Sequence, residues 1–220
     1  MRSETLSLGL DEPAREAGSI RLGPGAVVLT AFAHGRAAEL LAGIHDIRRS
    51  APLRQMVTPG GWKMSVAMTN CGDAGWVTDR CGYRYDRIDP DTGKVWPDMP
   101  PAFMALASAA AAEAGFAKFA PDACLINQYN PGARLSLHQD RNELDLAAPI
   151  VSVSLGLPAI FLWGGLKRTN PTVRVPLMHG DVAVWGGVDR LRFHGVQTLA
   201  DGTHPMTGTV RYNLTFRKAR

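Results

Sequence analysis

Residues 211–217, RYNLTFR, alternate in the manner of a β-strand. In an extended chain, side chains two residues apart point to the same side. One face of this strand is apolar and consists of Tyr212, Leu214 and Phe216. The other face carries Arg211 and Arg217 with Asn213 between them. A core explains the apolar face, but it does not explain the polar one.

The two arginines suggest a ligand with a negative charge at each end. Their Cα atoms lie roughly 20 Å apart in an extended strand, and two inward-leaning side chains leave a gap for a short linear dicarboxylate such as 2-oxoglutarate. A guanidinium binds a carboxylate in a bidentate geometry that lysine cannot copy. A solvated strand face is the competing interpretation. Asn127 and Tyr129, which share a face of LINQY (125–129), favour an oxygen-rich ligand.

Three further residues form a candidate metal site. His138 and Asp140 follow the strand-like LSL and point to the same side of an extended chain, so they can hold one ion. A third ligand would give two histidines and one carboxylate, which leave open positions of the kind that iron(II) oxygenases need. His194, in LRFHG, is the natural candidate.

These histidines also have structural interpretations. A second His-x-Asp triplet, His179 to Asp181, has a central glycine and precedes a strand-like run, which favours a tight turn over a ligand pair. His138 with Asp140 fits a metal or a structural role about equally well when taken alone. His194 alone is more often a hydrogen-bonded histidine within a sheet.

The pattern of apolar residues predicts an α+β fold that is mainly β. Eight short β runs follow Asp122 and are separated by Gly, Pro and Asp, which favours a double-sheet jelly roll. Helices are expected over 31–49 and from Pro101 to Gly115, as supports on the N-terminal side. The eight runs are ACLINQY, ARLSLHQ, PIVSVSLG, AIFLWG, VRVPLMH, DVAVWGG, LRFHGVQ and RYNLTFR.

Length and composition set the remaining bounds. The 220 residues suit a loose arm over residues 1–20 and one domain over 21–220, and nothing calls for more than a monomer. Three cysteines without CxxC spacing fit a reduced, cytoplasmic protein. No secretory signal or membrane span is expected, because the longest apolar region, 148–165, is interrupted by Ser, Pro and Gly. The formal charge of +4 is compatible with a nucleic-acid partner but does not require one.

Several of these blocks together resemble the AlkB family of iron(II)/2-oxoglutarate dioxygenases, which repair alkylated nucleic-acid bases. The resemblance extends from about residue 60 to residue 217, and it rests on long blocks in the right order. They are LINQYNPGARLSLHQD, PIVSVSLGLPAIF, DVAVWGG, the distal HG and RYNLTFR. The fold it implies is the double-stranded β-helix, a relative of the jelly roll, with a nucleotide-recognition lid.

The resemblance also implies roles for individual residues. The metal ligands are His138, Asp140 and His194, and the triplet at 179 is not a ligand pair. Arg217 lies near the keto-acid carboxylate and the metal-bound aspartate. The residues that match the surroundings of 2-oxoglutarate are Asn127, Tyr129, Arg211 and Asn213.

Residues 60–100 would form the lid, where aromatic residues alternate with cations. Trp76 matches the family residue that stacks on the flipped base, and Tyr83 matches one that contacts the backbone of the damaged nucleotide. Arg168 matches a basic residue at the substrate rim, although it also suits a solvated turn. Trp62 and Tyr85 equally suit the small core of a hairpin.

The implied activity is oxidative dealkylation of bases such as 1-methyladenine and 3-methylcytosine in DNA, with RNA as an alternative. It requires iron(II), 2-oxoglutarate and O2, and it releases formaldehyde, succinate and CO2. One position departs from the family: Asn142 stands where its best-known member has an acidic residue that reads the exocyclic amine, so the lesion preference is open. Two alternatives are a dioxygenase of this fold that acts on protein or a small molecule, and a nucleic-acid binder without catalysis.

Overall fold

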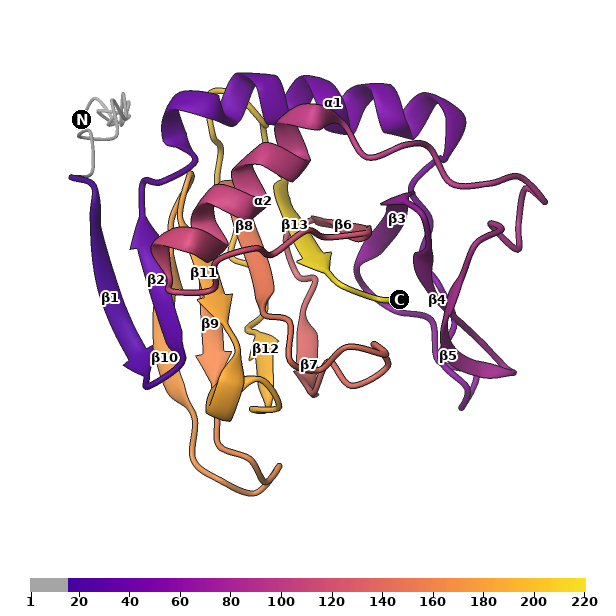
Figure 1. Ribbon diagram of the computed structural model, residues 1–220. Helices are drawn as coiled ribbons and strands as arrows, with labels where there is room; N and C mark the ends of the chain where they lie inside the picture. Colours follow the sequence, from indigo (N-terminus) through magenta and orange to yellow (C-terminus); the bar gives the residue numbers. More distant parts are fainter. Residues whose placement is uncertain (1–15) are drawn as a thin grey trace, which may run out of the picture.

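The computed structural model describes residues 16–220, and its centre is a pair of antiparallel sheets (Figure 1). The major sheet has the order β1 (Gly18–Gly23), β2 (Ala26–Thr30), β11 (Val182–Trp185), β8 (Ile150–Gly156), β13 (Arg211–Arg217), β6 (Ala123–Tyr129) and β3 (Ala67–Gly72). The minor sheet has the order β10 (Val173–Leu177), β9 (Ala159–Trp163), β12 (His194–Val196) and β7 (Leu135–His138). The predicted jelly roll is confirmed, and all eight predicted β runs contain a strand.

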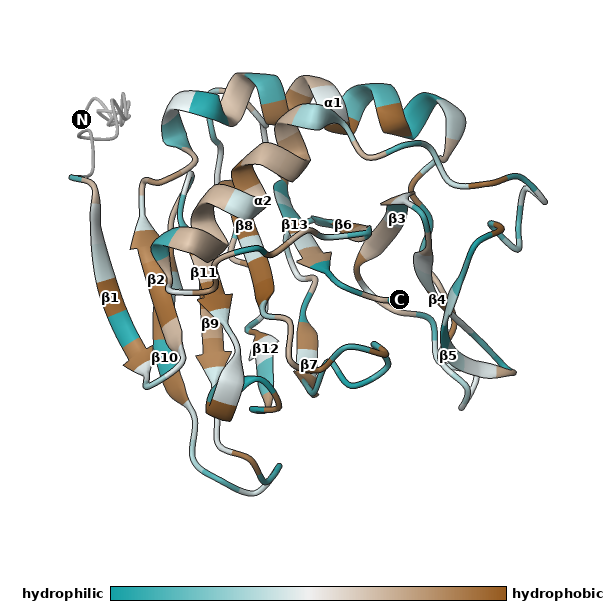
Figure 2. Cartoon of the chain, viewed as in Figure 1, coloured by the Kyte–Doolittle hydropathy of each residue, from teal (hydrophilic) through white to brown (hydrophobic). Residues whose placement is uncertain are grey.

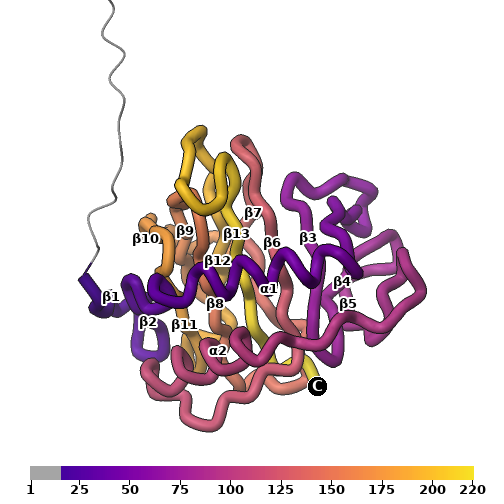
Figure 3. Tube along the Cα trace, turned by 90° about the horizontal axis from the view of Figure 1, so that it is seen from above, coloured from indigo at the N-terminus to yellow at the C-terminus, as the bar shows by residue number. Residues whose placement is uncertain are grey.

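Two helices lie along one face of the major sheet. They are α1 (Ala37–Ser50), preceded by the short 3-10 helix η1 (His34–Arg36), and α2 (Pro101–Glu113); a second 3-10 helix, η2 (Gly187–Asp189), lies before β12. Seen from above, α1 crosses over the strands of this sheet (Figure 3). The ring of Phe103 in α2 meets that of Phe216 in β13 edge to face, with centroids 6.0 Å apart. The helices therefore cover the apolar side of β13, as the sequence predicts.

The predicted helix over 31–49 begins six residues late. Ala31 has a φ of +55°, a left-handed conformation that cannot belong to an α-helix. Its N–H donates to Asp181 Oδ1 at 2.9 Å. The chain therefore turns after β2 before it enters η1 and α1.

The predicted N-terminal arm, residues 1–20, overlaps the first strand. Residues 18–20 belong to β1, which pairs with β2 in a hairpin at the edge of the major sheet. Residues 1–15 of the predicted arm lie outside the described residues. Figure 2 shows that β2, the inner strand of this hairpin, is mostly hydrophobic. Burial of β2 between β1 and β11 makes the hairpin part of the domain.

The segment predicted as a lid is not one continuous element. Its part 67–72 is β3, which pairs with β6 in the major sheet. Beyond β3 the chain forms a separate hairpin of β4 (Gly75–Asp79) and β5 (Gly82–Asp86). Asn70 fixes this hairpin, because its side chain accepts from the N–H of Trp76 and donates to its carbonyl, each at 3.0 Å.

Candidate metal centre and ligand cavity

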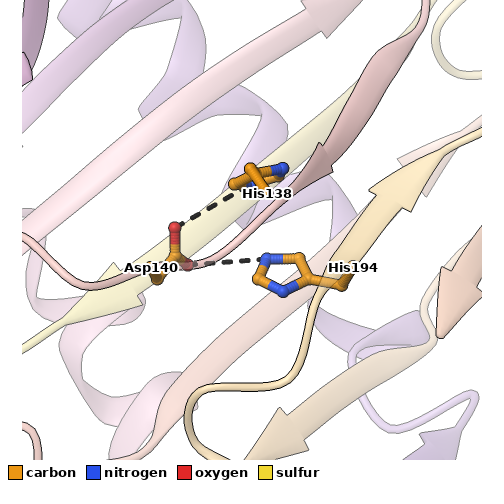
Figure 4. A group of neighbouring side chains, drawn as sticks. All are labelled: His138, Asp140 and His194. Carbon is orange, nitrogen blue, oxygen red and sulfur yellow. Dashed lines mark ion pairs between the residues drawn. The ribbon is translucent and has the colours of Figure 1, made fainter. Parts of the chain in front are cut away.

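Two histidines and one aspartate meet where β7 and β12 pair. His138 and His194 lie directly opposite each other in this pairing, and their ring centroids are 4.4 Å apart. Asp140 follows two residues after His138 (Figure 4). Its Oδ1 is 3.8 Å from His138 Nε2, and its Oδ2 is 3.7 Å from His194 Nε2. One potential ligand atom from each residue lies within 4.8 Å of the others, so the three can hold one metal ion.

The other ring nitrogens orient both histidines. His138 Nδ1 lies 2.9 Å from the carbonyl of Ser136, and His194 Nδ1 lies 3.0 Å from that of Arg192. A proton on Nδ1 in each ring would satisfy these contacts and leave the Nε2 lone pair for a metal. Burial, and then the proximity of His138, lowers the pKa of His194 to about 3. His194 is therefore neutral at physiological pH, as a metal ligand must be.

Asp140 is held as a carboxylate. Burial alone would raise its pKa, but the charge of Arg217 outweighs burial and lowers the pKa below its usual range. Arg217 donates to Asp140 Oδ2 from Nε at 3.1 Å and from Nη2 at 2.9 Å. An ionised aspartate beside two histidine Nε2 atoms has the donor set of an iron(II) site with open positions.

A buried network behind Asp140 joins the metal site to the β4–β5 hairpin. Arg190 donates to the Asp140 carbonyl at 2.6 Å and to Glu143 Oε2 at 3.0 Å. The Tyr85 hydroxyl donates to Glu143 Oε1 at 2.6 Å. The sequence analysis missed Arg190 and Glu143, because no local pattern marks two residues that meet across 47 positions. Tyr85, for which a hairpin core was the alternative interpretation, joins the hairpin to the loop that follows the metal ligand Asp140.

Arg211 is a buried cation without a full set of partners. It is 1% exposed, and its guanidinium lies over the ring of Tyr129, with the Cζ atom 5.0 Å from the ring centroid. Nη2 donates to Ser154 Oγ at 3.0 Å, whereas Nε and Nη1 have no partner among the described residues. A buried charge with free donors is costly unless an anion pairs with it. This position therefore fits one carboxylate of 2-oxoglutarate.

Amide and hydroxyl groups line the wall between the two arginines. Asn127 Nδ2 donates to Asn213 Oδ1 at 3.1 Å, and Asn213 Nδ2 donates to Ser152 Oγ at 2.8 Å. Thr215 donates to Asn213 Oδ1 at 2.9 Å. The alternating serines of β8 belong to the same network, since Ser152 bonds Asn213 and Ser154 bonds Arg211. Their spacing in IVSVSLG is a signal in the sequence that was not recognised.

All twelve predicted site residues line a single cavity of about 920 Å³. Trp76 and Tyr83 lie in this lining with stacked rings, whose centroids are 5.7 Å apart and whose planes are inclined by 23°. Asn142 is exposed at its rim. Arg168 donates to the Leu137 carbonyl at 2.5 Å, so it is fixed at the rim by a hydrogen bond. The twelve are Trp76, Tyr83, Asn127, Tyr129, His138, Asp140, Asn142, Arg168, His194, Arg211, Asn213 and Arg217.

The triplet at 179 lies outside this cavity and has a structural role, as predicted. His179 Nδ1 accepts from the Gly156 N–H at 2.9 Å. Asp181 accepts from the N–H groups of Ala31 and Met178, each at 2.9 Å. These bonds close the turn before β11 and join it to the end of β2.

The jelly roll and its two-histidine, one-carboxylate site define an oxygenase that uses iron(II) and an oxo-acid. Comparison with known proteins agrees, because a model described as the 2OG-Fe(II) oxygenase superfamily matches residues 25–217. The chain belongs to the 2OG-Fe(II) oxygenase superfamily. The enzyme is thus a dioxygenase that uses iron(II), 2-oxoglutarate and O2.

Within the superfamily, the chain is similar to AlkB. It is 61% identical to the alpha-ketoglutarate-dependent dioxygenase AlkB of Escherichia coli over 198 residues, 90% of this chain and 92% of that protein. It is 35% identical to the human nucleic acid dioxygenase ALKBH1 over 55% of this chain and 31% of that protein. The solved structure of OsALKBH1 superposes with a TM-score of 0.80 at 28% identity, covering 91% of this chain and all of that one. The resemblance to AlkB seen in the sequence is confirmed.

Proposed function

We propose that this enzyme oxidatively removes alkyl groups from N-alkylated bases of the 1-methyladenine and 3-methylcytosine type in DNA. The observation that carries the proposal is the stacked pair of Trp76 and Tyr83, which lines the same cavity as the metal triad. Aromatic faces hold bases of any sequence by stacking. The names of the relatives support the same substrate class, since human ALKBH1 is called a nucleic acid dioxygenase.

Each part of the cavity has a role in this proposal. His138, Asp140 and His194 bind iron(II), and Arg217 keeps the Asp140 carboxylate ionised and oriented. Arg211 binds the carboxylate of 2-oxoglutarate that is distant from the metal, and Asn127, Tyr129 and Asn213 line the space between. When bound, iron(II), 2-oxoglutarate and O2 supply the oxidation that turns an N-methyl group into formaldehyde and yields succinate and CO2.

Within residues 60–100, the segment before β3 and the β4–β5 hairpin act as the nucleotide-recognition lid. A damaged base must leave the stack before its edge reaches the metal, and Trp76 receives it there. A cationic lesion is also attracted to the electron-rich face of the indole. Tyr83 contacts the backbone of that nucleotide, and Arg168 lies at the rim of the same cavity. Asn142 meets the exocyclic amine, and an amide can donate as well as accept there.

Charge at the cavity favours a polyanion over a peptide or a small molecule. Besides Arg211 and Arg217, four cations contribute to its lining, and none of these four forms an ion pair with another described residue: Lys63, Arg134, Arg141 and Arg168. Unpaired cations of this kind bind phosphates. No helix in residues 16–220 is both long and apolar enough to cross a membrane. We infer that the enzyme works as a monomer in the cytoplasm. We also infer that RNA is an additional substrate.

The test is formaldehyde release from an oligonucleotide with one 3-methylcytosine, in the presence of iron(II), 2-oxoglutarate and ascorbate. Asp140→Ala is the control, because it removes the only carboxylate of the triad. Release by the wild type and none by the variant is the expected result. Turnover of 2-oxoglutarate without repair of this base or of 1-methyladenine would mean that the substrate is wrong, and methylated peptide would be tested next.

A further inference from the structure

Trp62 is a solvent-exposed residue that lines the mouth of the cavity. Its side chain is 78% exposed, although tryptophan is usually well buried. Among the described residues, the exposed aromatic side chains are Trp62 and Tyr83, and both line this cavity. Tyr83 already stacks on Trp76, whereas the Trp62 ring stacks on no other described ring. A hairpin core was the alternative interpretation of Trp62, and its exposure contradicts that alternative.

The backbone under Trp62 is fixed. The Thr58 N–H donates to the Trp62 carbonyl at 2.9 Å, and the Trp62 N–H donates to Thr58 Oγ1 at 3.2 Å. Gly61 closes the turn with a φ of +83°, a conformation that suits glycine. A Cβ on Gly60 would lie 3.4 Å from Trp62 Cδ1, so the indole rests beside the turn. A solvent-facing ring on a fixed backbone loses less entropy when it binds a flat partner than a ring on a mobile loop.

Cations lie next to Trp62 in the chain and across the turn. Lys63 is exposed and follows it directly, and it lines the cavity. Ser65 accepts from the Arg134 N–H at 3.0 Å and donates to the Arg134 carbonyl at 2.9 Å, which holds this second cation beside the segment. An aromatic face beside cations is the combination that binds single-stranded nucleic acid.

We propose that Trp62 stacks on a base adjacent to the lesion and thereby makes the enzyme prefer a lesion within a strand over a lesion without a neighbouring base. Trp76 holds the damaged base, and Trp62 holds its neighbour. The inference rests on the proposed function, because it assumes a nucleic-acid strand in the cavity. It assigns a second base-binding position to the lid.

The test is a double-mutant cycle in which one change removes a neighbouring base from the strand and the other replaces Trp62 in the protein. The binding of short single strands with one 3-methylcytosine is measured without O2, with iron(II) and 2-oxoglutarate present. In one strand the 5′ neighbour is abasic, in another the 3′ neighbour, and in a third both bases are intact. For wild-type enzyme, removal of the correct neighbour weakens binding about 5- to 150-fold, since base stacking contributes about 1–3 kcal/mol.

Three variants complete the cycle. In Trp62→Ala the preference for the intact neighbour falls below about twofold, and in Trp62→Phe most of it remains. Val188→Ala, which shortens an exposed apolar side chain outside the cavity lining, keeps the wild-type preference. A Trp62→Ala enzyme with the full wild-type preference would overturn the inference, and so would a wild type that ignores both neighbours. Neither result affects the proposed function, which fails only if no methylated strand is repaired.

Discussion

Arg217 places two donors on one oxygen of Asp140, Oδ2, at 3.1 and 2.9 Å. The other oxygen, Oδ1, accepts no hydrogen bond from the described residues and lies 3.8 Å from His138 Nε2. The arginine thus sets both the charge and the orientation of the carboxylate. It does so from β13, an interior strand of the major sheet, whereas the histidines come from the minor sheet.

Arg217→Lys should weaken iron(II) binding. Lysine cannot place two donors on Oδ2, and loss of a group that orients a metal ligand lowers affinity about 10- to 100-fold. The measurement is an anaerobic iron(II) titration without 2-oxoglutarate, so that a change in cosubstrate binding does not contribute. Arg48→Lys, at an arginine that bonds the Tyr212 hydroxyl outside the cavity lining, is the control and should bind iron as the wild type does. Equal affinities of all three proteins would contradict the role assigned to Arg217.

Arg211→Met should weaken 2-oxoglutarate binding without loss of iron. Hydrogen bonds to charged groups contribute about 1.5–3 kcal/mol, which corresponds to about a 10- to 150-fold rise in the dissociation constant. 2-Oxopentanoate has the same length without the distal carboxylate, so the wild type should bind it weakly. The variant should bind the two oxo-acids about equally, as measured by isothermal titration without O2. If the variant still prefers 2-oxoglutarate as the wild type does, Arg211 does not bind the distal carboxylate.

Gly195→Ala should disrupt the metal site by pushing apart the two strands that carry its histidines. A Cβ there would lie 2.7 Å from the Leu135 carbonyl oxygen, a backbone atom that cannot rotate away. Strands β12 and β7 must then separate, and His194 moves from its place opposite His138. Iron(II) affinity should fall by about 10-fold or more. Gly202→Ala is the matched control, because its Cβ would meet only the flexible Leu157 side chain, at 3.1 Å; comparable iron binding by the two variants would refute this account.

His179 should make stability depend on pH. Burial, and then the nearby His204 and His34, lowers the pKa of His179 from 6.5 to about 4. The unfolded chain binds a proton below pH 6.5 while the folded protein does not, so this stability is present above pH 6.5 and is lost as the pH falls toward 4. The loss at pH 5 should be about 2 kcal/mol.

Urea unfolding of His179→Asn at pH 7 and pH 5 checks this expectation. Asparagine keeps an acceptor near the Gly156 N–H but cannot be protonated. The wild-type advantage over the variant should shrink at pH 5. His45→Asn, at an exposed position in α1, should follow the wild type at both pH values. Parallel behaviour of wild type and His179→Asn would show that His179 is not the titrating group.

The strands from residue 123 onward could be predicted because their signal is local. RYNLTFR alternates residue by residue, and Gly, Pro and Asp separate it from its neighbours. The β1–β2 hairpin was missed, although the GPG between Gly23 and Gly25 marks its turn. Its outer strand is mostly exposed, so it carries no apolar stripe. A strand at the edge of a sheet is hard to predict from apolar periodicity, because pairing with its neighbour, rather than a buried apolar face, holds it in place.

The candidate site likewise has residues that local sequence spacing predicts and residues that only the fold brings together. His138 and Asp140 share one short motif, and Arg211 and Asn213 share one strand, so sequence spacing finds them. The network of Arg190, Glu143 and Tyr85 could not be found, because each bond joins distant segments that only the fold brings together. Their hydrogen bonds depend on tertiary structure that no local periodicity encodes.

The position of β13 in the major sheet has a consequence for biosynthesis. It pairs with β8 on one side and β6 on the other, yet it is made after both. Until β13 has been made, the edges of β8 and β6 that pair with it have unpaired backbone N–H and C=O groups. Such unpaired strand edges are sites at which chains aggregate. The same late strand carries Arg211 and Arg217, so a chain that stalls before residue 211 has neither a closed sheet nor a complete cavity. The nascent enzyme therefore becomes competent for oxidation only when the strand that closes its major sheet has been made.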